Sequence, residues 1–180
     1  MKKVYILIAL VVLAALSRLF PVHNNFTPVA ALALFSGAFL SRRLAFVVPV
    51  IAMLAADILM GLKNSDPIYM EYLTKGQFLP VYAAMLLTAA IGFGLNNKFS
   101  VQQVLGRTVA ASLAFFLLTN FAYLYQDLSL YPRTFNGLML SYYNAIPFYK
   151  WTLVGDLFYS SLMFGTWYFI AYRKPVAVKA

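Results

Sequence analysis

Six apolar stretches, separated by short polar segments, fill most of this 180-residue sequence. Most approach the length of about 20 residues that an α-helix needs to cross the hydrocarbon of a membrane, whereas the stretch at 27–40 is short for a full span and is expected to be little tilted, extended by its flanks or partly re-entrant. With 63% hydrophobic and 11% charged residues, the chain lacks the polar surface of a water-soluble domain. The sequence therefore predicts an all-α integral membrane protein with six transmembrane helices in a single domain, residues 1–180. The helices are expected at about 4–20, 27–40, 44–62, 80–95, 104–125 and 149–172.

The distribution of basic residues predicts the orientation of this bundle. Nine of the 14 Lys and Arg residues fall on the side of the two termini and five fall on the other side. Basic residues are enriched in cytoplasmic loops, so both termini are expected in the cytoplasm and the chain in the inner (plasma) membrane. A cleaved signal peptide ending near Ser17 is an alternative for the first stretch, although Arg18 follows it directly.

Several function classes are disfavoured by composition. The net charge of +9 and the pI near 9.8 are explained by membrane orientation, so no nucleic-acid partner is expected. The chain has no cysteine and one histidine, which removes thiolate and multi-histidine metal sites. No nucleotide-binding or hydrolase motif is present. Neither an enzyme nor an intrinsic cofactor is therefore expected.

Three polar side chains interrupt the apolar runs at one predicted depth. Asp57, Asn120 and Asp156 each lie five or six residues from the expected outer end of a helix, or roughly 7–9 Å at the helical rise. Ionisable groups in a membrane are costly and commonly mark a functional path. We expect these three residues to form the floor of a substrate pocket. The alternative is packing, through interhelical hydrogen bonds or ion pairs with Arg18 or Lys150.

The outer loops are longer and more aromatic than the inner ones, which predicts that substrate enters from outside. Aromatic side chains gather at membrane interfaces, but they also stack on planar ligands. A short amphipathic helix within residues 132–147 is expected to act as a lid. The loop residues predicted to contact substrate are His23, Asn24, Asn25, Tyr72, Tyr131 and Tyr143. For His23, a solvent-exposed or packing position is the alternative to binding a metal carried by the substrate.

Five segments carry a resemblance to a known group of membrane proteins. They are Asn25–Ala38, Ala55–Gly61, Leu118–Phe121, Tyr131-Pro132 and Gly155-Asp156-Leu157. They resemble the substrate-binding S components of energy-coupling-factor (ECF) vitamin transporters. The resemblance implies an S-component-like bundle of six helices with cytoplasmic termini. It also implies an outer vitamin pocket closed by loops, and a membrane coupling subunit with ATPases as partner.

Within that group, the chain is most similar to the solitary cobalamin-transporter (BtuM-like) type, which implies a bound corrinoid. The cysteine that such proteins place on cobalt is absent here, as is the AxxxA pattern that docks helix 1 on the coupling subunit. Whether substrate uptake uses an ATPase module therefore stays open.

The leading hypothesis is a membrane-embedded subunit that binds a vitamin or related small cofactor at the outer face. A second is a structural or assembly protein that uses small-residue faces such as Gly106, Ala110 and Ala114. A third is an intramembrane enzyme with Asp57 and Asp156 as general acid and base.

Overall fold

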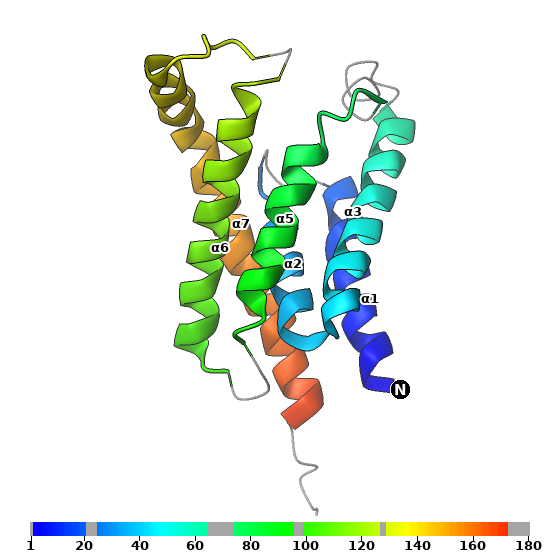
Figure 1. Ribbon diagram of the computed structural model, residues 1–180. Coiled ribbons are helices and arrows are strands. Elements are labelled where there is room, and N and C mark those ends of the chain that lie inside the picture. Colours follow the sequence, from blue (N-terminus) through cyan, green and yellow to red (C-terminus); the bar gives the residue numbers. More distant parts are fainter. Residues whose placement is uncertain (1, 21–24, 65–73, 96–98, 127–128, 173–180) are drawn as a thin grey trace, which may run out of the picture.

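The computed structural model describes residues 2–20, 25–64, 74–95, 99–126 and 129–172. Within these ranges the chain is all-helical, with six α-helices and one short 3₁₀ helix (Figure 1). The elements are α1 (Lys2–Leu16), η1 (Ser17–Leu19), α2 (Val29–Phe39), α3 (Arg42–Asn64), α5 (Leu79–Gly92), α6 (Val101–Tyr123) and α7 (Phe135–Tyr172). The start of α1 and the end of α7 lie at the same end of the bundle, called proximal below, and the opposite end is called distal.

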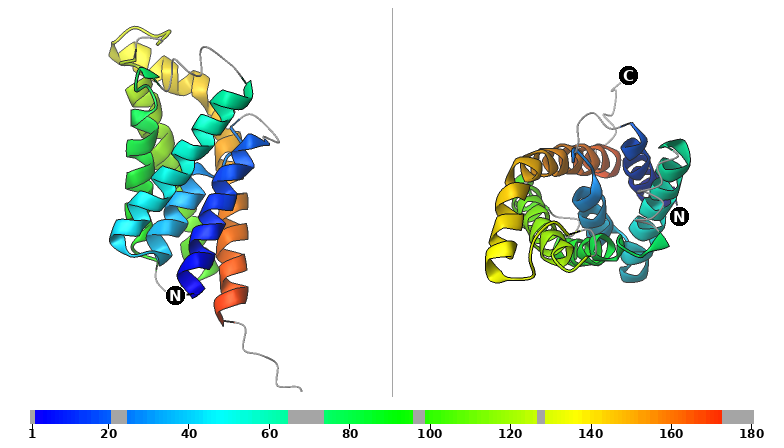
Figure 2. Two further views of the ribbon diagram at one scale, coloured as in Figure 1. Left: turned by 90° about the vertical axis from the view of Figure 1, so that its right-hand side faces the viewer. Right: turned by 90° about the horizontal axis from the view of Figure 1, so that it is seen from above.

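The short helix α2 is the centre of the bundle. Its residues from Val29 to Gly37 are all buried, and α1, α3, α5, α6 and α7 all pack against it. Figure 2 shows these helices surrounding α2 when the bundle is viewed from above. A helix that is apolar on every side is stable only when it is enclosed. The sequence of α2 therefore determines the position that it takes.

Two glycines allow α2 and α5 to cross in close contact. A Cβ atom at Gly37 would overlap the carbonyl oxygen of Ala89, and one at Gly92 would overlap that of Leu34. Small residues at such crossings bring two backbones together, which is how apolar helices gain packing energy inside a membrane. The core next to this crossing is aromatic, with ring centroids 5.0–5.5 Å apart. Its members are Phe35, Phe39, Phe99, Phe164 and Trp167.

The outward faces of α3 and α6 are apolar. Ile51 and Leu62 of α3 are 61% and 68% exposed, and Val101 of α6 is 74% exposed. Two helical segments within the described residues, Arg42–Lys63 and Val101–Tyr123, are long and apolar enough to cross a membrane. Continuous apolar exteriors of this kind are unfavourable in water and suit a lipid environment. The fold is thus a helical bundle with two candidate membrane spans.

The observed helices differ from the expected ones in length. α2 has 11 residues and α5 has 14, so each is shorter than a full membrane crossing. α6 begins at Val101, because Ser100 and Gln103 form a capping box at its start. The amphipathic helix expected within 132–147 is the first part of α7, which continues through Pro147. In Figure 2 this part lies across the distal end before α7 turns down the bundle.

The crossing of α2 and α5 gives a stability prediction. Gly92→Ala is expected to destabilise the fold by about 1–3 kcal/mol, because the new methyl group overlaps the α2 backbone. Gly106→Ala is the matched control, since a Cβ at Gly106 meets no atom within 4 Å. Thermal unfolding of the purified proteins in detergent measures both. An unfolding midpoint for Gly92→Ala at or above that of Gly106→Ala would contradict the close crossing.

Candidate functional site

The N-terminus of α2 lies inside the bundle rather than at its surface. Pro28, the residue before the helix, is fully buried and offers no side-chain cap. The chain reaches this point through Asn25, whose φ of 65° is the left-handed conformation that asparagine tolerates better than most residues. The first backbone N–H groups of a helix have no partner within the helix. A buried start such as this one therefore needs an acceptor from elsewhere.

Asp156 of α7 is that acceptor. Its Oδ1 accepts a hydrogen bond from the backbone N–H of Ala31 at 3.3 Å, and the side chain is 1% exposed. A carboxylate at a helix N-terminus is favoured by the orphan N–H groups and by the helix dipole. The preceding Gly155 is required by the same contact, because a Cβ there would lie 2.9 Å from the backbone nitrogen of Thr27. Gly155 and Asp156 together hold α7 against the buried start of α2.

Asp57 of α3 is held by a different set of elements. Its Oδ1 is ion-paired with Arg18 of η1, and its Oδ2 accepts a hydrogen bond from the hydroxyl of Tyr82 at 2.7 Å. The Asp57 side chain is 4% exposed and that of Arg18 is 17% exposed. This cluster ties the end of the first helical segment to α3 and α5. This ion pair is one of the two that the packing alternative for Asp57 predicts from the sequence.

Two adjoining cavities lie between the distal parts of α6 and α7, and we call them the distal cavities. Their volumes are about 270 and 240 Å³, and both are lined by Asn120, Ala145 and Phe148. The first is also lined by Tyr123, Tyr131, Ser141 and Asn144. The second is also lined by Asn25, Phe115, Phe116, Thr119, Tyr149 and Thr152. The described walls are aromatic rings, neutral amides and hydroxyls.

Ring and amide contacts hold the walls of the distal cavities in place. The rings of Phe116 and Tyr149 have centroids 4.5 Å apart, which joins α6 to α7 across the second cavity. Asn120 donates a hydrogen bond from Nδ2 to the backbone oxygen of Phe116 at 2.9 Å. Asn144 donates from Nδ2 to the hydroxyl of Tyr131 at 3.2 Å. The polar groups of the cavities are thus positioned by their neighbours before any ligand enters.

Asp156 lies one helical turn beyond Thr152, a residue of the second cavity wall. The Ser112 side chain of α6 lies beside both the Asp156 carboxyl and the phenol of Tyr149, which also lines this cavity. The carboxylate is therefore behind the cavity wall rather than on it. Its Oδ1 caps α2 at Ala31, and Ser112 lies on the side of α6.

The structure separates the predicted site residues into groups. Asn25, Asn120 and Tyr131 line the distal cavities. Asp57 and Asp156 bind other helices, as described above, and Tyr143 is 72% exposed and does not line either cavity. His23, Asn24 and Tyr72 lie outside the described residues.

Several wall residues were not among the predicted site residues. Those on α7 are Ser141, Asn144, Ala145, Phe148, Tyr149 and Thr152, and those on α6 include Phe115, Phe116 and Thr119. The α7 residues recur at intervals of three and four, which places them on one face of a helix. The spacing is present in the sequence, but it marks one face only when the helix expected within 132–147 continues into the one expected at 149–172, as it does in α7.

Comparisons with known proteins identify a family without an assigned activity. The model of a family described as "Family of unknown function (DUF6580)" matches residues 1–178. No curated protein and no solved structure is detectably similar to the chain. The described residues contain no group of three or more His, Cys, Asp or Glu side chains that could hold a metal ion.

The Asp57 cluster makes a prediction that separates packing from substrate binding. Asp57→Ala is expected to destabilise the fold by about 2–4 kcal/mol, because it leaves the partly buried Arg18 without its partner. The double variant Arg18→Met/Asp57→Leu removes both charges and should lose less stability than Asp57→Ala. Chemical or thermal unfolding in detergent provides the comparison. If Asp57→Ala unfolds at the wild-type midpoint, the ion pair does not hold these helices together.

Proposed function

The chain belongs to the DUF6580 family, and we propose that it is a membrane-embedded substrate-binding subunit that captures a small, neutral, planar aromatic molecule. The substrate is vitamin-like or cofactor-like, and it enters from the outer face, at the distal end of the bundle. In this proposal the protein does no chemistry on its substrate. It binds the molecule between α6 and α7 and delivers it inward, with or without a separate energy-coupling membrane subunit and its ATPases.

The observation that carries this proposal is the lining of the distal cavities. Rings such as Phe116, Phe148 and Tyr149 offer faces and edges on which a flat molecule stacks, and Asn25 and Asn120 offer amide groups at the rim. Ligand sites commonly combine an apolar majority with a few placed polar groups. An amide both donates and accepts hydrogen bonds, so it suits the alternating donor and acceptor edge of a nitrogen heterocycle.

The charge of the wall supports a neutral substrate. None of the described residues that line the distal cavities is charged. A charged group brought there would lose its hydration without gaining a partner, which costs several kcal/mol. The volumes of about 270 and 240 Å³ favour a ring system of one to three fused rings over a complete corrinoid. Cobalamin is therefore the less favoured substrate within this proposal.

The proposed topology has six membrane segments with both termini in the cytoplasm. The apolar exteriors of α3 and α6 support the membrane, and the excess of Lys and Arg on the side of the termini supports the orientation. The position of the α1 start and the α7 end at one end of the bundle is compatible with an even number of segments (Figure 1). The site of action is then the plasma membrane.

The two alternative functions have less support. An acid and base pair requires two carboxyl groups that act on one substrate, but Asp57 is engaged by η1 and α5, whereas Asp156 is engaged by α2 and lies beside α6. An assembly role would use small residues on helix surfaces, and the exposed Gly106 is such a position. The distal cavities have no part in that alternative.

Labelling of single cysteines tests the topology, and the absence of native cysteine makes the background clean. A membrane-impermeant maleimide applied to intact cells is expected to label Leu130→Cys, because Leu130 is 85% exposed at the distal end. Ser41→Cys, in the turn between α2 and α3, should react only after the membrane is permeabilised. The reverse pattern would overturn the proposed orientation.

Replacing the amide shared by both cavities tests substrate binding. Asn120→Leu keeps the size of the side chain but removes its hydrogen bonds. It is expected to lower the amount of copurifying small molecule roughly tenfold, because losing the hydrogen bonds weakens the binding free energy by about 1.4 kcal/mol. The molecule is extracted from protein purified in detergent and identified by absorbance and mass spectrometry.

The matched control is Asn136→Leu, the same change at an exposed position of α7 that lines neither distal cavity. It should retain the wild-type amount of bound molecule. Both variants should elute as folded protein in size-exclusion chromatography. Equal retention in the two variants would contradict the distal site, and an aliphatic or highly charged copurifying molecule would contradict the proposed substrate class.

A further inference from the structure

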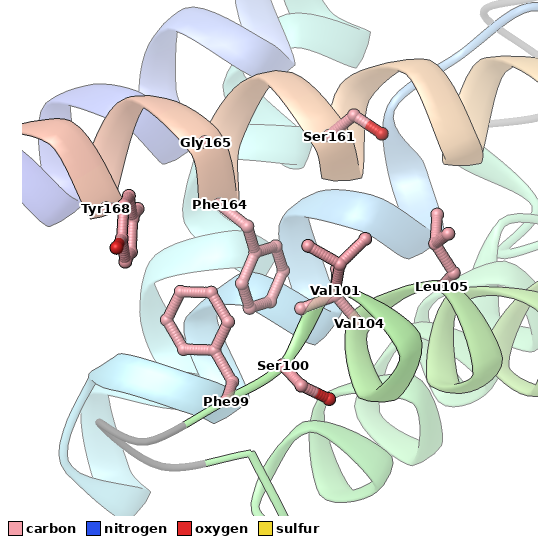
Figure 3. A pocket seen from close by; sticks show the side chains of 9 residues that line it. All are labelled: Phe99, Ser100, Val101, Val104, Leu105, Ser161, Phe164, Gly165 and Tyr168. Carbon is pink, nitrogen blue, oxygen red and sulfur yellow. The ribbon is translucent and has the colours of Figure 1, made fainter.

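A third and larger cavity, the proximal cavity, lies at the opposite end of the same helix pair. Its volume is about 420 Å³. It is lined by Phe99, Ser100, Val101, Val104, Leu105, Ser161, Phe164, Gly165 and Tyr168. Figure 3 shows the start of α6 with the residues before it on one side and α7 on the other. The cavity lies where these helices separate, near the end of α7.

The proximal cavity shares aromatic rings, hydroxyl groups and a lack of described charge with the distal cavities, although its lining has no amide side chain. Phe99 and Phe164 meet edge to face with ring centroids 5.4 Å apart, and Tyr168 adds a third ring (Figure 3). Ser100 and Ser161 add hydroxyl groups, and none of the described lining residues is charged. A wall of rings with a few neutral hydrogen-bonding groups favours the same kind of ligand, a neutral aromatic molecule.

Gly165 gives this cavity part of its space. A Cβ at Gly165 would meet no atom within 4 Å, so the helix surface at this position is unfilled. Close helix contact is the usual reason for glycine in a membrane helix, as at Gly37 and Gly92. At Gly165 that reason is missing, because no described atom packs against it. The glycine leaves room beside the rings of Phe164 and Tyr168.

Buried hydroxyl groups lie on α6 and α7 between the distal and proximal cavities. Thr108 and Ser112 lie one turn apart on α6, and Ser160 lies one turn beyond Asp156 on α7. All three residues are buried. Ser112 lies beside Asp156 and Tyr149, whereas the hydroxyls of Thr108 and Ser160 have no hydrogen-bond partner among the described residues. Buried hydroxyls are nearly always satisfied by protein, water or ligand, so these two suit contact with water or with the polar edge of a molecule.

We infer that the proximal cavity is a second binding site for a neutral, planar aromatic molecule, occupied before release at the proximal end. This inference rests on the proposed function for the identity of the molecule, since both sites would take the same substrate class. It adds a position in the bundle that the distal site does not require. α6 and α7 would then carry the substrate between two uncharged, aromatic sites, past the buried hydroxyls of Thr108 and Ser160.

Photolabelling with benzophenone, a neutral two-ring aromatic ketone, tests the inference on the full-length protein in lipid nanodiscs. Peptides that contain residues 99–105 and 161–168 report the proximal site, and those that contain residues 115–123 and 141–152 report the distal site. Peptides from the lipid-facing surface of α3 give the background. Labelling of both sites above this background is expected, with saturation as the probe concentration rises.

Gly165→Leu should extend a side chain into the proximal cavity, since its Cβ meets no atom within 4 Å, and lower labelling of the proximal peptides roughly tenfold, while distal labelling persists. Gly165→Ala should cause a smaller decrease. Gly106→Leu is the control, because it adds the same side chain on α6 in open space and does not line the cavity. Unfolding midpoints verify that all three variants fold.

Proximal labelling that stays at background, or that Gly165→Leu leaves unchanged, would overturn the inference. Displacement of the label by oleate but not by a second neutral aromatic compound would also overturn it, because a lipid chain would then be the occupant. A different outcome would uphold the proximal site alone: proximal peptides are labelled and lose the label in Gly165→Leu, while distal peptides stay at background. That last outcome would reject the distal site on which the proposed function depends.

Discussion

The contact on which the rest of the bundle depends is the cap that Asp156 provides to the buried start of α2. An 11-residue helix that is apolar on every side has to sit in the centre, and its first N–H groups are then far from water. The Asp156 side chain accepts a hydrogen bond from one of them, at Ala31, at the positive end of the helix. α7 is thereby fixed against α2, and the distal cavities form between the same α7 and α6.

Charged side chains elsewhere in the bundle also bind protein rather than face a cavity. Arg107 donates to the carbonyl oxygen of Ile91 at 2.6 Å, near the end of α5, and Lys63 donates to that of Leu19 at 2.9 Å. Cations are favoured at helix C-termini, where the carbonyl groups lack partners. With Asp57 held by Arg18, these charges stabilise helix ends and crossings. The described cavity walls are left with amides, hydroxyls and rings.

The sequence predicted the helical class, the six apolar segments and the importance of Asp57, Asn120 and Asp156 as polar interruptions. The sequence offered Arg18 as a partner in the packing alternative for Asp57, but the role of Asp156 could not be predicted, because the depth at which α2 begins depends on how five other helices enclose it. The pattern from Ser100 to Gln103 is a capping box, which places the start of α6 at Val101 rather than at the expected 104. The break expected between 147 and 149 is absent, because α7 continues through Pro147 although proline usually interrupts a helix.

The absence of charge in the described cavity walls has a consequence for selectivity in the proposed binding role. Asp57 is already paired with Arg18, and a charged analogue would find no counter-ion in the described walls. Discrimination would then depend on ring shape and on the pattern of hydrogen-bond donors and acceptors that Asn120 and its neighbours present. Leaving such an amide unpaired costs more than losing one apolar contact, so the amides exclude close analogues more strongly than the rings do.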